Sequence, residues 1–161
     1  MKSVNMEIDL KVPAQKAWDA IRDSASLFPK IMPSHFKSIE VIGDGNVGTI
    51  RRIKYGEGMK MATHESERIE ALDETNMTVT YSVIEGEALN VFKVIKATIK
   101  LLPGADANSC RLSWTAEFEP AGNRIPPSDS IEEATTNMFK AMEGYLLLGN
   151  NGENASCKRQ L

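Results

Sequence analysis

Two glutamates, Glu65 and Glu67, stand two residues apart in a stretch that is typical of a β-strand. Side chains two apart in a strand share a face, so both carboxylates point into the apolar interior if Ile69 and Ala71 do. An ionised carboxylate is disfavoured in an apolar pocket unless a cation or a ligand donor meets it. Glu67 is therefore a candidate anchor for an amine, an N–H group or a hydroxyl of a bound molecule.

Two other interpretations of Glu67 stay open. In the structural one, Glu67 lies near the mouth of a cavity, where it is hydrated or paired with Lys93 or Arg68. In the catalytic one, Lys93 shares the inward-facing position of Ile95 and acts together with Glu67, because acid–base chemistry needs both a base and a positioned donor. His64 is a further candidate helper for this chemistry.

Metal binding and nucleophilic catalysis have no comparable pattern. The two histidines, His35 and His64, are isolated, and neither Cys110 nor Cys157 stands at ligand spacing from them. No recognisable motif places a serine or a cysteine beside a histidine. We therefore expect no metal, no cofactor and, in a reducing compartment, no disulfide.

The loop GDGNVG at residues 43–48 has the spacing G-x-G-x-x-G of dinucleotide-binding proteins. That motif binds phosphate only where a helix follows, because the phosphate sits at the helix N-terminus. Here residues 49–53 have the composition of a strand. The sequence therefore predicts a turn in which the glycines supply positive φ angles.

Strands and turns alternate along most of the chain. An opening strand is predicted at residues 6–12 from alternating apolar and charged residues, and six more at 38–42, 49–55, 63–72, 77–84, 91–101 and 110–119. This pattern is typical of an antiparallel meander. The residues predicted to face inward on the later strands are Val79, Tyr81, Val83, Lys93, Ile95, Ala97, Ile99, Leu112, Trp114, Ala116 and Phe118.

Helices are predicted in three places. Two short ones fall within residues 13–23 and 27–33, and a long one begins with a cap at Ser128 or Ser130 and ends near Leu148. The apolar stripe of the long helix must face the sheet, and consists of Ile131, Ala134, Met138, Met142 and Tyr145. Residues 1–149 are predicted to form a single domain, and the polar tail at 150–161 is expected to be disordered.

Composition limits the classes of partner. The chain has 161 residues, 42% of them apolar, and a net charge of −3. Its basic residues are scattered, so no nucleic-acid partner is predicted. No apolar run approaches the length of a membrane span, and the first residues lack the apolar core of a secretion signal. We expect a cytoplasmic protein with no membrane contact, either a monomer or a weak dimer.

Four sequence landmarks occur in a characteristic order: LFPKIMPSHF at 27–36, GDGNVGTI at 43–50, YSVIEG at 81–86 and AMEGYLLL at 141–148. Together they resemble the plant pathogenesis-related class-10 family, which includes the major birch pollen allergen and belongs to the START-like helix-grip superfamily. The resemblance implies an α+β fold in which a curved seven-stranded antiparallel sheet wraps around a long C-terminal helix, with two short helices, and encloses a hydrophobic cavity.

The resemblance implies an intracellular, defence-related protein that binds a small apolar or amphipathic ligand, such as a hormone, a flavonoid or an alkaloid. In this family the Glu67 position is among the ligand contacts, and Met59, Met61, Met138 and Met142 could give a pliable wall. The residues predicted to contact the ligand are Glu67, Ile69, Val79, Tyr81, Ile95, Ala97, Trp114, Met138 and Met142. Loop residues 57–61 are expected to border the entrance.

An alternative is that the chain is an enzyme of specialised metabolism, similar to the relatives that condense dopamine with an aldehyde. Those enzymes use a lysine, an acidic pair and a tyrosine inside the same cavity. At the corresponding positions this chain has Val79 for the lysine, Ala97 for the aspartate and Glu65 near the tyrosine, and only the glutamate is kept, as Glu67. Lys93 would have to replace the missing lysine.

Overall fold

The computed structural model describes residues 2–59, 62–122 and 128–160, with side chains for all of these except 128–130 and 149–160. Its elements, in chain order, are β1 (Lys2–Leu10), α1 (Ala14–Arg22), α2 (Ser24–Ile31), β2 (Phe36–Ile42), β3 (Ile50–Tyr55), β4 (His64–Asp73), β5 (Thr78–Gly86), the 3₁₀ turn η1 (Glu87–Asn90), β6 (Phe92–Pro103), β7 (Cys110–Pro120) and α3 (Ser128–Gln160). The predicted strands and helices are confirmed, with differences of a few residues at most ends.

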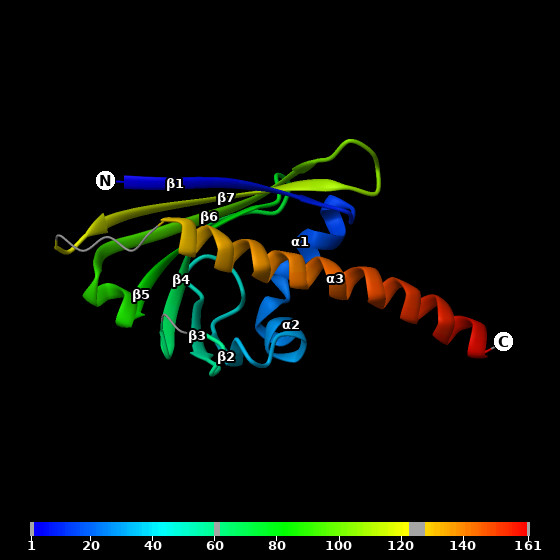
Figure 1. Ribbon diagram of the computed structural model, residues 1–161, viewed down its shortest axis with the longest axis horizontal. Helices are drawn as coiled ribbons and strands as arrows, with labels where there is room; N and C mark the ends of the chain where they lie inside the picture. Colours follow the sequence, from blue (N-terminus) through cyan, green and yellow to red (C-terminus); the bar gives the residue numbers. More distant parts are fainter. Residues whose placement is uncertain (1, 60–61, 123–127, 161) are drawn as a thin grey trace.

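The strands of the described residues form one seven-stranded antiparallel sheet in the order β1-β7-β6-β5-β4-β3-β2. Strands that follow each other in sequence pair as a meander, while the segment containing α1 and α2 connects one edge strand, β1, to the other, β2. Figure 1 shows α3 lying across the sheet with α1 and α2 beside it. This arrangement confirms the predicted fold of a curved sheet around a C-terminal helix.

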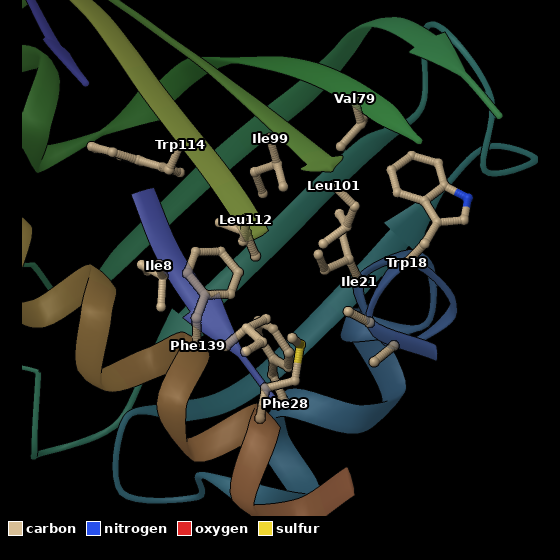
Figure 2. Packing of buried hydrophobic residues seen from close by; sticks show 14 of the residues in the cluster. Ile8, Trp18, Ile21, Phe28, Val79, Ile99, Leu101, Leu112, Trp114 and Phe139 are labelled. Carbon is tan, nitrogen blue, oxygen red and sulfur yellow. The ribbon is translucent and has the colours of Figure 1, made fainter. Parts of the chain in front are cut away.

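The most completely buried side chains come from β1 and the residues after it, β7, α1 and α3. The largest of them, each with less than 2% exposure, are Trp18, Phe139, Leu10, Leu112, Met142, Val12 and Cys110. Figure 2 shows Ile8, Leu112 and Phe139 packed together in this region, with Trp18 beside Leu101. We call this region the closed end. Full burial of an apolar side chain contributes about 1.5–3 kcal/mol, so the closed end is a main source of stability.

Polar contacts also attach α3 to the closed end. The buried Glu143 accepts a hydrogen bond of 2.6 Å from the backbone N–H of Lys11, just after β1. One turn earlier, Lys140 Nζ donates to the carbonyl oxygen of Asp9 at 2.8 Å. Lys11 lies just beyond the last pair of the β1–β7 ladder, and Asp9 lies within the ladder. These bonds fix α3 along its axis relative to the sheet.

The glycine loop before β3 is a turn, as predicted. Gly43, Gly45 and Gly48 have φ angles of 130°, 90° and 95°, which residues with a Cβ rarely adopt. The backbone N–H of Gly45 donates to Thr49 Oγ1 at 2.9 Å and closes the loop on itself. Because β3 follows instead of a helix, the loop lacks the geometry of a dinucleotide-binding motif.

Helix α3 continues to Gln160, about twelve residues beyond its predicted end near Leu148. Gly149 and Gly152 favoured an early end, but the tail also contains good helix formers such as Ala155, Lys158 and Arg159, and the backbone stays helical through both glycines. The division into a domain at 1–149 and a separate tail stays a prediction. The proposed caps at Ser128 and Ser130 lie outside the described side chains.

No helix of the described chain is long and apolar enough to cross a membrane.

Candidate functional site

A cavity of about 800 Å³ lies between the sheet and the N-terminal part of α3. We call this region the hollow end. Most of its wall is apolar and comes from all layers of the fold; the apolar residues include Phe28, Ile53, Ile69, Val79, Val83, Ile95, Ala97, Ile99, Trp114, Ile131, Met138 and Phe139. A volume of this size falls in the usual range for small-molecule sites.

One wall of the cavity is polar. Arg51 and Tyr55 reach it from β3, Glu65 and Glu67 from β4, and Tyr81 from β5. These three strands are neighbours in the sheet, and the residues fall on one face because they alternate along each strand. The polar cluster thus forms one patch of a lining that is mostly apolar but also includes other polar residues, such as Thr49 and Glu87.

The cluster is only partly satisfied by its own hydrogen bonds. Tyr55 Oη donates to Glu65 Oε2 at 3.1 Å. Glu67 is 6% exposed, and its Oε2 atom is buried without a hydrogen-bond partner in the described structure. The Nε atom of Arg51 is also buried without a hydrogen-bond partner in the described structure. Buried polar atoms without partners are uncommon in folded proteins and need an explanation.

The carboxyl groups of the cluster are shifted towards their neutral forms. Burial, together with the nearby charge of Glu67, raises the pKa of Glu65 to about 8. Burial also raises the pKa of Glu67, against the opposing charge of Arg51. The pKa values of Tyr55 and Tyr81 are raised mainly by burial, so both phenols stay protonated. The cluster therefore offers hydrogen-bond donors and acceptors with little negative charge near neutral pH.

A smaller space of about 150 Å³ adjoins the cavity on the side of β7. It shares Phe92, Ile95, Ala97, Trp114 and Ile131 with the main cavity and adds only apolar residues, namely Val4, Ala116 and Phe118. The site thus has a polar wall and an apolar side lobe. This form suits an amphipathic molecule with one polar edge.

The sequence matches the model of the "Pathogenesis-related protein Bet v 1 family" over residues 1–149. The chain belongs to the Bet v 1 family.

Individual relatives agree with this assignment. "MLP-like protein 423" of Arabidopsis thaliana is 41% identical over 89% of this chain and 93% of its own length. "Probable intracellular pathogenesis-related protein T1" of Catharanthus roseus is 34% identical over 89% of this chain and 94% of its own length. A norcoclaurine synthase mutant of Thalictrum flavum, solved with a transition-state analogue, superposes with a TM-score of 0.72. It is 22% identical over 92% of this chain and 96% of that one, which shows a shared fold.

The structure brings most of the predicted site residues of this Bet v 1 family member together. The predicted residues that line the cavity are Glu67, Ile69, Val79, Tyr81, Ile95, Ala97, Trp114 and Met138. Met142 differs, because it is fully buried in the closed end and does not line the cavity. It lies one turn after Met138, where α3 has reached the packed core. The expectation that it lines the cavity is therefore wrong.

Lys93 also differs from its predicted position. It is exposed and does not line the cavity, and Phe92 lines it instead. The pairing of β6 with β7 shifts register between Phe92 and Val94, which is the signature of a β-bulge. The extra residue turns Lys93 away, so its predicted inward position is wrong.

A second irregularity explains the outward position of Ala71. The β4–β5 register shifts between Ile69 and Ala71, so Ala71 is exposed and Leu72 packs against the core. The bulge lies beyond Ile69 in the strand and leaves Glu65 and Glu67 on the cavity side. The expected inward direction of the two carboxylates is thus correct, although the argument from Ala71 was not.

Arg51 and Tyr55 are members of the site that the sequence analysis did not single out. Both share a strand face with the buried Ile53, so the two-residue alternation of β3 could have indicated them. The double arginine at 51–52 concealed the pattern, because arginine is usually exposed. In the structure Arg51 lines the cavity and Arg52 is exposed.

His64 lies outside the polar cluster. Its ring is half-exposed, and Nδ1 lies 3.3 Å from Glu87 Oε1. The same carboxylate accepts a hydrogen bond of 2.7 Å from the backbone N–H of Thr63, which ties η1 to the start of β4 near the cavity.

Met59 and Gly58 line the cavity from the predicted entrance loop, whereas Met61 lies outside the described residues. The described residues contain no cluster of three or more potential metal ligands.

Proposed function

We propose that this protein is an intracellular plant binding protein for a small amphipathic molecule, of the hormone, flavonoid or alkaloid type, with a role in defence. The observation that carries the proposal is the cavity of about 800 Å³ with a buried polar cluster in a mostly apolar lining. Membership of the Bet v 1 family and the name of the Catharanthus relative support an intracellular, pathogenesis-related role. A cytoplasmic location and a monomer or weak dimer are part of the proposal.

Apolar contact supplies most of the binding free energy in this proposal. Burial of apolar surface contributes about 25 cal/mol per Å², so a ligand that buries about 250 Å² gains on the order of 6 kcal/mol before the costs of association. The polar cluster then orients the ligand. Its members are fixed on three paired strands, which limits the ordering cost on binding.

Catalysis similar to that of norcoclaurine synthase is the second candidate, and it is less well supported. In its favour, Glu65 has a pKa of about 8 and lies in the cavity beside Tyr55, as a general acid requires. Against it, the lysine and aspartate positions of those enzymes are occupied by Val79 and Ala97, and Lys93 is exposed outside the cavity. Among the described residues, no lysine lines the cavity beside the carboxyl pair.

The first test is displacement of a neutral fluorescent probe, N-phenyl-1-naphthylamine, by adenine-type hormones, flavonoids and alkaloids. The proposal predicts that the probe binds and that one class displaces it selectively. Ala97→Phe should abolish probe binding, because Ala97 is 6% exposed and lines the cavity, so the larger side chain occupies ligand space.

Ala71→Phe provides the matched control, because Ala71 is exposed on β4 outside the cavity. It should leave the dissociation constant of the probe unchanged. Failure of the wild-type protein to bind the probe and all three classes would contradict the proposed function. Turnover of an amine and an aldehyde that is lost in Glu67→Gln, with binding retained, would favour the catalytic candidate instead.

A further inference from the structure

Two buried polar atoms of the cavity wall, Arg51 Nε and Glu67 Oε2, have no hydrogen-bond partner in the described structure. One is an N–H donor and the other is a carboxylate acceptor. Leaving such a group unpaired in the interior costs about 1–3 kcal/mol, and more when the group is charged. Both residues line the same cavity.

Strand pairing sets the two side chains opposite each other. Arg51 and Glu67 are direct partners in the β3–β4 ladder, so both leave the sheet on the cavity side. Such cross-strand neighbours commonly form an ion pair. Among the described residues this pair does not form one, although six others do. Donor and acceptor therefore stand apart, each still able to bond to a third group.

The charge of the cluster indicates which third group fits. Glu65 and Glu67 disfavour simultaneous ionisation, since burial and mutual repulsion raise the pKa of Glu65 to about 8. Burial also raises the pKa of Glu67, against the opposing charge of Arg51. Both carboxyl groups are therefore shifted towards their neutral forms in the cavity wall. A charged ligand would add an uncompensated charge to an apolar cavity, which is costly.

Resting on the proposed binding function, we propose that Arg51 and Glu67 form a subsite for a neutral ligand that carries a hydrogen-bond acceptor and an N–H donor on adjacent atoms. A lactam or a related heterocyclic amide has this edge. Arg51 Nε–H donates to the carbonyl oxygen of the ligand, and the ring N–H donates to Glu67 Oε2. Both unpaired atoms gain partners without any change in net charge.

The apolar side lobe completes the description of the ligand. It adjoins the main cavity through Ile95 and Ala97, on the opposite side of β5 from the β3–β4 pair. A ligand whose polar edge contacts Arg51 and Glu67 therefore extends an apolar substituent towards β7. The subsite recognises the polar edge, and the lobe selects the apolar part.

Five compounds built on two fused rings test this subsite by isothermal titration calorimetry at pH 7. The probes are 2-quinolinone, N-methyl-2-quinolinone, naphthalene, 2-naphthylmethylammonium and 2-naphthoate. The first has the full lactam edge, the second lacks the donor, the third lacks both polar groups, and the last two carry a positive and a negative charge. We expect 2-quinolinone to bind about 10- to 100-fold more tightly than each of the others, as hydrogen bonds to charged groups allow.

The double variant Arg51→Met with Glu67→Leu removes donor and acceptor together and replaces them with apolar side chains of similar size. It should bind 2-quinolinone and N-methyl-2-quinolinone equally, with the affinity for naphthalene kept within about twofold. Its melting temperature should not fall, because replacing unpaired buried polar groups by apolar ones is neutral or stabilising. Arg52→Met, at the exposed neighbouring arginine, is the control and should retain the preference for the lactam.

The possible results separate this inference from the function on which it rests. Equal binding of 2-quinolinone, its N-methyl derivative and naphthalene would leave the binding function intact and overturn the subsite. Tightest binding of the ammonium or the naphthoate would overturn it too, as would a lactam preference that survives in the double variant. Absence of binding for all five compounds would instead count against the proposed function itself.

Discussion

The two ends of the molecule use the same sheet and helix in opposite ways. At the closed end, α3 contacts β1 and α1, and side chains such as Leu112 and Met142 are completely buried. At the hollow end, the same helix covers a cavity of about 800 Å³, and a polar cluster lies on the facing strands. Side chains are fully buried at one end, and a cavity is left open at the other.

The closed end therefore stabilises the fold, and the hollow end leaves space for a ligand. Close packing and the bond from Lys11 N–H to Glu143 hold α3 at the closed end, so the helix does not need to fill the space at the other. A cavity costs dispersion contacts, and an unpaired buried charge costs solvation. Both features lower the stability of the fold at the hollow end, and the close packing of the closed end compensates for the loss. Substitutions at the two ends should therefore have different consequences.

The largest predicted effect is loss of stability at the closed end. Leu112 is 0% exposed, so Leu112→Ala should lower the free energy of unfolding by about 2–5 kcal/mol through lost burial and a new void. Ile95→Ala, in the cavity wall, should cost only about 1 kcal/mol because the removed atoms already border empty space. Urea unfolding measures both. Equal losses would remove the contrast between the two ends.

A somewhat smaller effect is expected from the polar attachment of α3. Glu143→Ala leaves the Lys11 N–H without its acceptor and should lower the free energy of unfolding by about 1–3 kcal/mol. Glu143→Gln keeps an acceptor oxygen and should lose less. Chemical denaturation with amide hydrogen exchange at Lys11 would show this order. A Gln variant as unstable as the Ala variant would mean that the charge matters more than the hydrogen bond.

The hollow end should make stability depend on pH. The pKa of Glu65 rises from an ordinary 4.5 to about 8 on folding, so the folded state binds a proton more tightly than the unfolded state between these values. The free energy of unfolding should then decrease as pH rises from about 5 to 8, by roughly 1–3 kcal/mol. The raised pKa of Glu67 acts in the same direction.

Glu65→Gln should flatten this pH dependence in thermal unfolding measured at several pH values. The exposed Glu85 offers a control, since Glu85→Gln should leave the slope unchanged. A wild-type stability that rises over the same range would contradict the assignment of a protonated carboxyl group in the cavity.

The smallest effect is expected at Lys93, because the bulge in β6 places it outside the cavity. Lys93→Ala should change the dissociation constant of N-phenyl-1-naphthylamine by less than about twofold, within the range of substitutions at exposed positions. Fluorescence titration is sufficient to measure it. A loss of probe affinity of tenfold or more would indicate that Lys93 belongs to the binding site.

Regular strands made much of this site predictable from the sequence. Alternation and the resemblance to the family placed Val79, Tyr81, Ala97 and Trp114 on one face, and all four line the cavity. The approximate strand boundaries followed from the turn residues between them. These inferences depend on local geometry, which short sequence patterns encode well.

The errors have non-local causes. The bulge beside Lys93 arises from pairing with β7, which the β6 sequence alone does not reveal. Met138 and Met142 lie on the same helical stripe, and only the path of α3 across the sheet decides which one meets the cavity and which one the core. The unpaired state of Arg51 likewise depends on the distance to Glu67, which no sequence pattern fixes.

The most direct test of the account is to locate a bound ligand. With methyl-labelled protein and unlabelled N-phenyl-1-naphthylamine, intermolecular nuclear Overhauser effects should connect the probe to Ile69, Val79 and Ala97 in the cavity wall. Methyl groups of Leu112 at the closed end and of the exposed Val94 should show none. Contacts confined to Val94 or other exposed methyl groups, with none to the cavity wall, would contradict the claim that the hollow end is the binding site.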